Sequence, residues 1–133
     1  MENLDVLRLL KAAQVLERSM SISLIYSGLR VPQYRLLDFL GGMGQATVTE
    51  MSEKLQVRRA TASILINELI KSGIVEVTEN ASDRRSFHIR LTQMGANKLE
   101  AARKDISVLR EKLSRNFSPE MIRMLNEFSE QVD

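Results

Sequence analysis

The residues best suited to chemistry in this sequence of 133 residues gather in one stretch, between positions 58 and 73. Its apolar residues follow helical spacing, which predicts one buried helix face: Ala62, Leu65, Ile66, Leu69 and Ile70. Other positions hold polar or cationic groups of the kind that reach base edges and phosphates: Arg58, Arg59, Thr61, Ser63 and Asn67. The pattern indicates contact with nucleic acid, and Gly73 is placed to end the helix.

Further cationic residues follow in a segment whose apolar residues are interrupted by a polar, turn-prone stretch. This pattern predicts a β-hairpin with Arg84 and Arg85 at its tip. We expect Arg85 to enter the minor groove of DNA, because narrow grooves attract arginine. Asp83 is expected to orient Arg85. The expected phosphate contacts are Arg84, Arg90 and, further upstream, Thr47.

Composition argues against the chemistry of enzymes and metals. The sequence has no cysteine and one histidine, so thiolate and histidine-cluster metal sites are not expected. No nucleophile with a neighbouring base and no paired carboxylates stand out. The glycines at 41, 42 and 44 lack the lysine that follows a phosphate-binding loop. We therefore expect no enzymatic activity and no cofactor. The net charge of +2 is weak support for a polyanionic partner.

The start of the sequence and its apolar runs bear on location. Charged residues are spread through the first turns, including Glu2, Asp5, Arg8 and Lys11, so a signal peptide is not expected. No apolar run approaches the roughly 18 residues that a membrane span needs. We therefore expect a cytoplasmic chain with no membrane partner.

Helical periodicity and end signals divide the first half of the chain. We expect helices over residues 3–27 and 32–40, followed by a mobile glycine-rich loop over 41–44. Thr47 begins a capping box that starts a short helix over 48–54. This short helix and the helix expected over residues 58–73 are predicted to form a helix-turn-helix.

The second half is predicted to hold two strands and two helices. Residues 74–79 and 87–91 are the expected strands of the hairpin, and the second strand alternates apolar and polar positions. Thr92 is placed to cap a helix that runs to about residue 115, and Ser118 starts the last helix. The expected fold is mainly α-helical with a small β-wing.

Apolar stripes on the terminal helices predict a homodimer, because they exceed what one small lobe can cover. The longest stripe steps by three and four residues, as in a heptad. The expected dimer contacts are Leu4, Leu7, Leu10, Leu99, Ala102, Ile106, Leu109, Leu113, Met121, Leu125 and Phe128.

Two short runs resemble signatures of the MarR family of bacterial transcriptional regulators. Asp83-Arg84-Arg85 is similar to the wing motif D-x-R, and Leu91-Thr92-Gln93-Met94-Gly95 is similar to the helix start L-T-x-x-G. The resemblance covers essentially the whole chain. It implies a single domain over 1–133, with dimerisation helices at about 1–30 and 93–133 and a winged helix-turn-helix lobe at about 32–92.

The resemblance also implies a function and its partners. It implies a homodimeric repressor that binds a pseudo-palindromic operator in double-stranded DNA. Many members release DNA when a small anionic aromatic compound binds between the dimer helices and the DNA-binding lobe. Tyr26, Tyr34 and Phe39 are the candidates for lining such a pocket for a phenolic effector, and buried aromatic packing is the other interpretation of all three.

The chain departs from the family pattern at two positions that matter for DNA. Arg58 stands where the family commonly has a capping Ser or Asp, so no side-chain acceptor is expected there. Ile64 stands where many members carry a base-contacting arginine. These departures leave a second interpretation open, a dimeric winged-helix module for protein interaction or anti-regulation that does not bind DNA.

Overall fold

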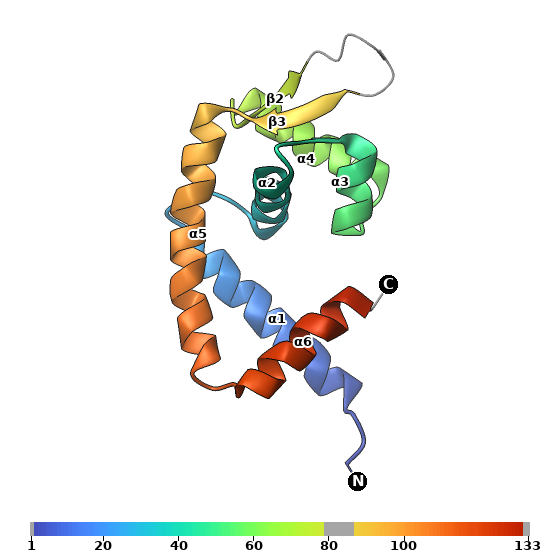
Figure 1. Cartoon of the computed structure of the whole chain (residues 1–133), viewed down its shortest axis with the longest axis vertical. Coiled ribbons are helices and arrows are strands. Elements are labelled where there is room, and N and C mark those ends of the chain that lie inside the picture. The colour runs from blue at the N-terminus through green and yellow to red at the C-terminus, as the bar shows by residue number, and fades with distance from the viewer. Residues whose placement is uncertain (1, 79–86, 132–133) are drawn as a thin grey trace.

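The computed structural model describes residues 2–78 and 87–131. Six helices and three short strands follow in the order α1 (Val6–Ser23), α2 (Val31–Met43), β1 (Gln45–Thr47), α3 (Val48–Leu55), α4 (Arg59–Lys71), β2 (Val75–Thr78), β3 (His88–Leu91), α5 (Gln93–Ser114) and α6 (Pro119–Gln131). The predicted mainly α fold with a small β-wing is confirmed. Figure 1 shows a lobe of α2, α3, α4 and the strands, with α1 and α6 below it and α5 spanning both parts.

The core of this lobe forms around α2. Leu36, Leu37 and Leu40 on α2 are fully buried, as are Met51 of α3 and Ile89 of β3. Each fully buried leucine contributes about 1.5–3 kcal/mol relative to an exposed one, so α2 is the element on which the lobe's stability depends most.

The sheet has the order β1-β3-β2 and is antiparallel throughout. Ile89 at its centre pairs with Ala46 on one side and Val77 on the other. The sequence did not predict β1, which is a strand of three residues that pairs with one edge of the hairpin. This pairing brings Thr47, at the start of α3, beside the hairpin.

The expected loop over residues 41–44 is wrong, because α2 continues to Met43. Gly41 lies inside the helix, where a Cβ would come within 2.6 Å of Leu99 Cδ2 on α5. The missing side chain of Gly41 therefore lets the two helices approach closely, and Gly41 does not make a turn. The chain turns instead at Gly44, where φ is +85°. The ion pair between Asp38 and Arg103, at 3.0 Å, joins the same two helices.

The expectation that the whole heptad on α5 contacts a second copy is wrong for its first two members. Leu99 and Ala102 are buried within the chain, at 3% and 0% exposure, as part of the lobe's core. The spacing that suits a partner helix suits α2 equally well. The later members, Ile106, Leu109 and Leu113, are half-buried, and Ile106 also packs against this core.

A tight junction joins the end of α4 to the start of α5. The Thr92 hydroxyl donates to the carbonyl oxygen of Gly73 at 2.6 Å and accepts from the Gly95 amide at 3.1 Å. The Thr92 amide donates to the carbonyl oxygen of Ile74 at 3.0 Å. Gly95 is buried so closely against Ile74 that an added Cβ would lie 2.0 Å from its carbonyl oxygen. The predicted cap at Thr92 is confirmed, and α5 can begin only where Gly95 allows this approach.

Substituting Gly95 by alanine should destabilise the fold, because the backbone of Ile74 must move to admit the methyl group. We expect a loss at the upper end of about 1–3 kcal/mol in the free energy of unfolding, measured by urea denaturation at fixed protein concentration. Gly42→Ala is the matched control, since no described atom lies within 4 Å of its Cβ position. It should raise stability by up to about 1 kcal/mol. Equal effects of the two variants would contradict the junction.

Candidate nucleic-acid interface

The predicted helix-turn-helix is formed by α3 and α4. Gln56 ends α3 with a left-handed backbone, at φ 54°, and the Val57 amide donates to the carbonyl oxygen of Ser52 at 3.0 Å. Leu55 and Val57 are buried and half-buried on either side of this residue. The turn is therefore fixed by its own backbone bonds and by apolar anchors, which sets the angle at which α4 leaves α3.

The buried face of α4 confirms four of the five residues predicted for it. Ala62, Leu65, Ile66 and Leu69 are buried, while Ile70 is 36% exposed because it lies at the edge of the stripe in the last turn. The end of the helix is as predicted. Gly73 has φ +74°, and the amide of Ile74 donates to the carbonyl oxygen of Leu69 at 2.9 Å.

The opposite side of α4 is open to solvent. Its exposed residues include Arg59, Thr61 and Asn67, and Ser63 is half-buried at the side. Arg58 is the N-cap, and no described side chain caps this helix start. The N-terminus of α4 therefore combines free backbone amides, the positive end of the helix dipole and the charges of two arginines. This surface suits the phosphates and base edges of a duplex.

The capping box at the start of α3 has the predicted form. The Glu50 amide donates to the Thr47 hydroxyl and the Thr47 amide donates to the Glu50 carboxylate, both at 3.1 Å. The hydrogen bond from the Thr47 backbone is the main cause that holds the pKa of Glu50 below its usual range. The Thr47 hydroxyl accepts the capping bond, so its own proton stays available to a phosphate oxygen.

The hairpin contains an ion pair that sequence reasoning missed. Arg90, an expected phosphate contact, donates from Nε to the Glu76 carboxylate at 2.8 Å, directly across the strands. Pairing the two predicted strands in register would have indicated this partner. The other expected residues of the hairpin, Asp83, Arg84 and Arg85, lie outside the described residues.

A second ion pair lies at the edge of α4. Arg30, at the start of α2, donates to the carboxylate of Glu68. Glu68 is exposed on α4, and its negative charge would repel phosphates if it were unpaired. The pair therefore reduces an unfavourable charge beside the candidate surface and ties α4 to α2.

A groove of about 530 Å³ lies between α2 and α3, and two of the three predicted aromatic residues line it. Tyr34 and Phe39 belong to its wall, whereas Tyr26 is 95% exposed and lies elsewhere, since it falls in the turn after α1. Burial, and next the charge of Asp38, raise the pKa of Tyr34, so its hydroxyl stays neutral. Arg35 and Lys54 add positive charge to the lining, while Arg103 pairs with Asp38.

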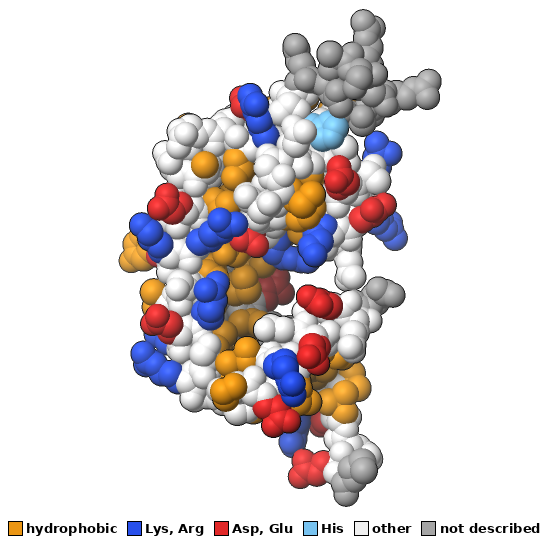
Figure 2. Space-filling model, viewed as in Figure 1, with side chains coloured by type: hydrophobic (Ala, Val, Ile, Leu, Met, Phe, Trp, Pro, Cys, Tyr) orange, Lys and Arg blue, Asp and Glu red, His pale blue; other side chains and the backbone are white. Residues whose placement is uncertain are grey.

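The two terminal helices leave their apolar sides largely uncovered. No residue of α1 or α6 within Val6–Ser23 and Pro119–Gln131 is buried. Leu7 is 76% exposed and Phe128 is 54% exposed. Figure 2 shows hydrophobic side chains at the surface in the lower part of the molecule, where these helices lie. Exposed apolar surface of this kind is typical of a protein–protein interface.

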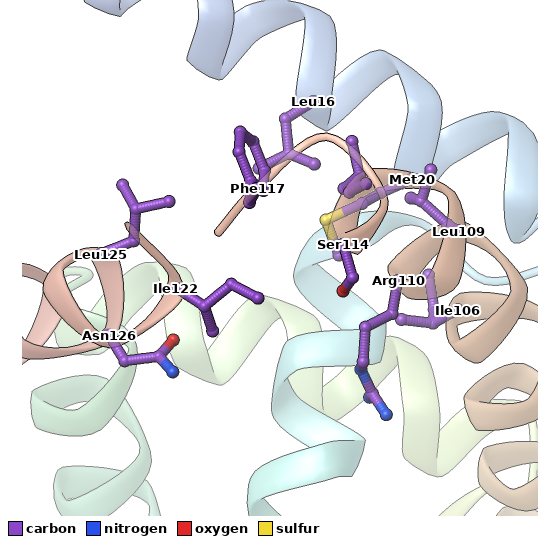
Figure 3. Close-up of a pocket in the computed structure, with 11 residues that line it drawn as sticks. Leu16, Met20, Ile106, Leu109, Arg110, Ser114, Phe117, Ile122, Leu125 and Asn126 are labelled. Carbon is purple, nitrogen blue, oxygen red and sulfur yellow. The ribbon is translucent and has the colours of Figure 1, made fainter. Parts of the chain in front are cut away.

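A cavity of about 230 Å³ opens where α1, α5 and α6 meet. In Figure 3, Leu16 and Met20 of α1 and Leu109 of α5 lie on one side, with Ile122 and Leu125 of α6 on the other. The three helices thus share an apolar seam that is incompletely filled within one chain. No helix in the described part of the chain is both long and apolar enough to cross a bilayer.

The arrangement of α3, α4 and the β-hairpin defines a winged helix-turn-helix protein. Residues 27–86 match the family model described as the MarR family. The fold of the whole chain agrees with that match, and this segment is similar to the MarR family of winged helix-turn-helix proteins.

Similar proteins include the HTH-type transcriptional repressor IacR of Pseudomonas putida, which is 26% identical over 89 residues. That match covers 67% of this chain, and the chain spans about half of IacR (52%). A crystal structure of a mutant MarR from E. coli complexed with operator DNA has a TM-score of 0.82 at 21% identity, covering 93% of this chain and 90% of that chain. NadR in complex with 4-hydroxyphenylacetate has a TM-score of 0.83 at 16% identity, covering 98% and 94%.

Proposed function

We propose that this chain is a sequence-specific DNA-binding transcriptional regulator, acting as a homodimeric repressor on a pseudo-palindromic operator in the cytoplasm. The observation that carries the proposal is the exposed surface of α4, which bears Arg59, Thr61 and Asn67, while Ala62, Leu65, Ile66 and Leu69 of the same helix are buried. A helix held in this way can enter the major groove while its other side stays in the core. The similar MarR structure is a complex with operator DNA, which supports DNA as the partner of this fold.

The roles proposed for individual residues follow from their reach and charge. Thr61 and Asn67 contact base edges, since their side chains are short and exposed on α4, and Ser63 does so from the half-buried side of the helix. The proposed contacts to the DNA backbone and minor groove are Thr47, Arg58, Arg59, Arg84, Arg85 and Arg90. Asp83 is proposed to orient Arg85.

Two substitutions separate base recognition from phosphate attraction. Thr61→Ala should weaken binding to a duplex selected from a random pool by about 1–3 kcal/mol and leave the salt dependence unchanged. Glu76→Gln frees Arg90 and removes a negative charge, so affinity should rise on selected and scrambled DNA alike. The slope of log affinity against log salt should steepen by about 1 per subunit.

Fluorescence anisotropy over a range of salt concentrations measures both quantities, with Glu100→Gln on α5 as the charge-matched control. A protein-interaction or anti-regulator module would yield no selected duplex from the pool. That result, or equal binding to selected and scrambled duplexes, would overturn the proposal.

The proposed dimer is supported by the uncovered apolar sides of α1 and α6. Interfaces between two copies are commonly two-fold symmetric, so the same exposed leucine would be buried in both copies. The contacts now proposed are Leu4, Leu7, Leu10, Ile106, Leu109, Leu113, Met121, Leu125 and Phe128. With a second copy in place, the cavity between α1, α5 and α6 lies next to the interface.

Leu7→Glu should convert the dimer to a monomer at micromolar concentration, because an unpaired buried charge costs several kcal/mol. Sedimentation equilibrium measures the change. Met43→Glu is the control, since Met43 is also exposed, at 53%, but lies in the winged lobe. Monomeric wild-type protein, or a Leu7→Glu variant that stays dimeric, would disprove this interface.

A small anionic aromatic effector is the third part of the proposal. The groove between α2 and α3 offers the aromatic walls of Tyr34 and Phe39 and the positive charges of Arg35 and Lys54. A ligand there touches α3, the first helix of the helix-turn-helix, and is placed to change how α4 meets DNA. The structure of NadR with 4-hydroxyphenylacetate supports this chemical class.

4-Hydroxyphenylacetate should therefore raise the melting temperature of the protein, because it binds the folded state. Lys54→Gln should weaken binding about tenfold, the effect of losing one charge-assisted hydrogen bond. Lys112→Gln, on α5 away from the groove, should not. Calorimetric titration that detects no binding, or equal binding by both variants, would contradict the proposed effector site.

A further inference from the structure

Ile64 is a large apolar side chain on the outer side of α4. It is 61% exposed, although four apolar residues of the same helix are buried. Successive residues of an α-helix are about 100° apart, so Ile64 lies nearly opposite Ala62, which is fully buried. Its position therefore makes it neither part of the lobe's core nor part of the surface formed by α1 and α6.

The neighbours of Ile64 leave it free to approach a partner closely. Ala60 is four residues before it and Asn67 is three residues after it, on the same side of the helix, and both are exposed. Both side chains are short or of moderate length, so Ile64 projects as the bulkiest apolar group there. Arg59 and Lys71, also exposed on α4, stand near the two ends of the helix. Glu68 follows Ile64 by four residues on the same side, and its carboxylate is paired with Arg30. A partner that offers negative charge around a small apolar spot would therefore suit this surface.

Duplex DNA has this combination in its major groove. Phosphates line its edges, and the C5 methyl group of thymine is the apolar group that a base pair presents there. Isoleucine forms no hydrogen bond with a base edge, but it can exclude water from a methyl group. The surface chemistry around Ile64 therefore fits a thymine better than any other base.

We propose that Ile64 packs against a thymine methyl group and makes the protein specific for a T at one position of each half-site. This inference rests on the proposed DNA binding. Ile64 and Asn67 are three residues apart, which is roughly 4.5 Å along the helix and close to one base step of about 3.4 Å. Asn67 can donate to and accept from adenine, so the neighbouring base pair is expected to be A·T as well.

Replacing single thymines by deoxyuridine tests the inference, because it removes only the methyl group and leaves every hydrogen-bonding edge in place. On a duplex selected from a random pool, wild-type protein should lose about fourfold in affinity per half-site at one position, the effect of one buried methyl group. Ile64→Ala should bind the thymine and deoxyuridine duplexes equally at that position. Ile64→Val should retain part of the difference.

Ile70→Ala is the matched control, because Ile70 is exposed on the same helix at a different angle. It should retain the full fourfold sensitivity. Deoxyuridine sensitivity that is the same in wild type and Ile64→Ala, or absent from wild type, would overturn the role of Ile64 while leaving the proposed function in place. Failure to select any specific duplex would overturn both.

Discussion

The junction of α4 with α5 is the constraint on which the rest of the chain depends. One hydroxyl, that of Thr92, bonds to the last turn before β2 and to the first turn of α5 at once. Gly95 then brings the α5 backbone against Ile74. Because α4, the hairpin and α5 meet at this point, the outer side of α4 has one fixed direction relative to the long helix.

Charge pairing shapes that surface as much as the cationic residues do. Glu68 and Glu76 lie beside the residues proposed to meet DNA, and each is paired with an arginine, Arg30 and Arg90. Exposed ion pairs add little to stability, about 0–1 kcal/mol each. Their effect here is electrostatic: they limit the repulsion of phosphates by the two carboxylates. The small net charge of the chain is thus compatible with a local surface that attracts a polyanion.

Features determined by adjacent residues were predictable from the sequence. The capping box at Thr47, the glycine end of α4 and the start of α5 at Thr92 all follow from short motifs, and all occur in the structure. Features that depend on distant contacts were not. The local sequence predicts a helix break at Gly41, and the approach of α5 explains why Gly41 lies inside α2.

The candidate site shows the same division. The exposed side of α4 follows from helical periodicity, so its residues could be named in advance. The heptad on α5 could not be divided between the lobe and a dimer, since Leu99 and Leu113 have the same spacing pattern but different surroundings. The partner of Glu68 and the α3 side of the groove at Tyr34 come from other elements, and sequence spacing contains no information about them.

Hydroxyl-radical footprinting of the wild-type protein on a selected duplex tests the central claim most directly. A homodimer that inserts one α4 helix into each of two major grooves should protect two segments of equal length. Their centres should be about one helical turn apart, roughly 10 base pairs or a multiple of it, with two-fold symmetry between the strands. A single protected segment, or uniform weak protection along the duplex, would contradict the account.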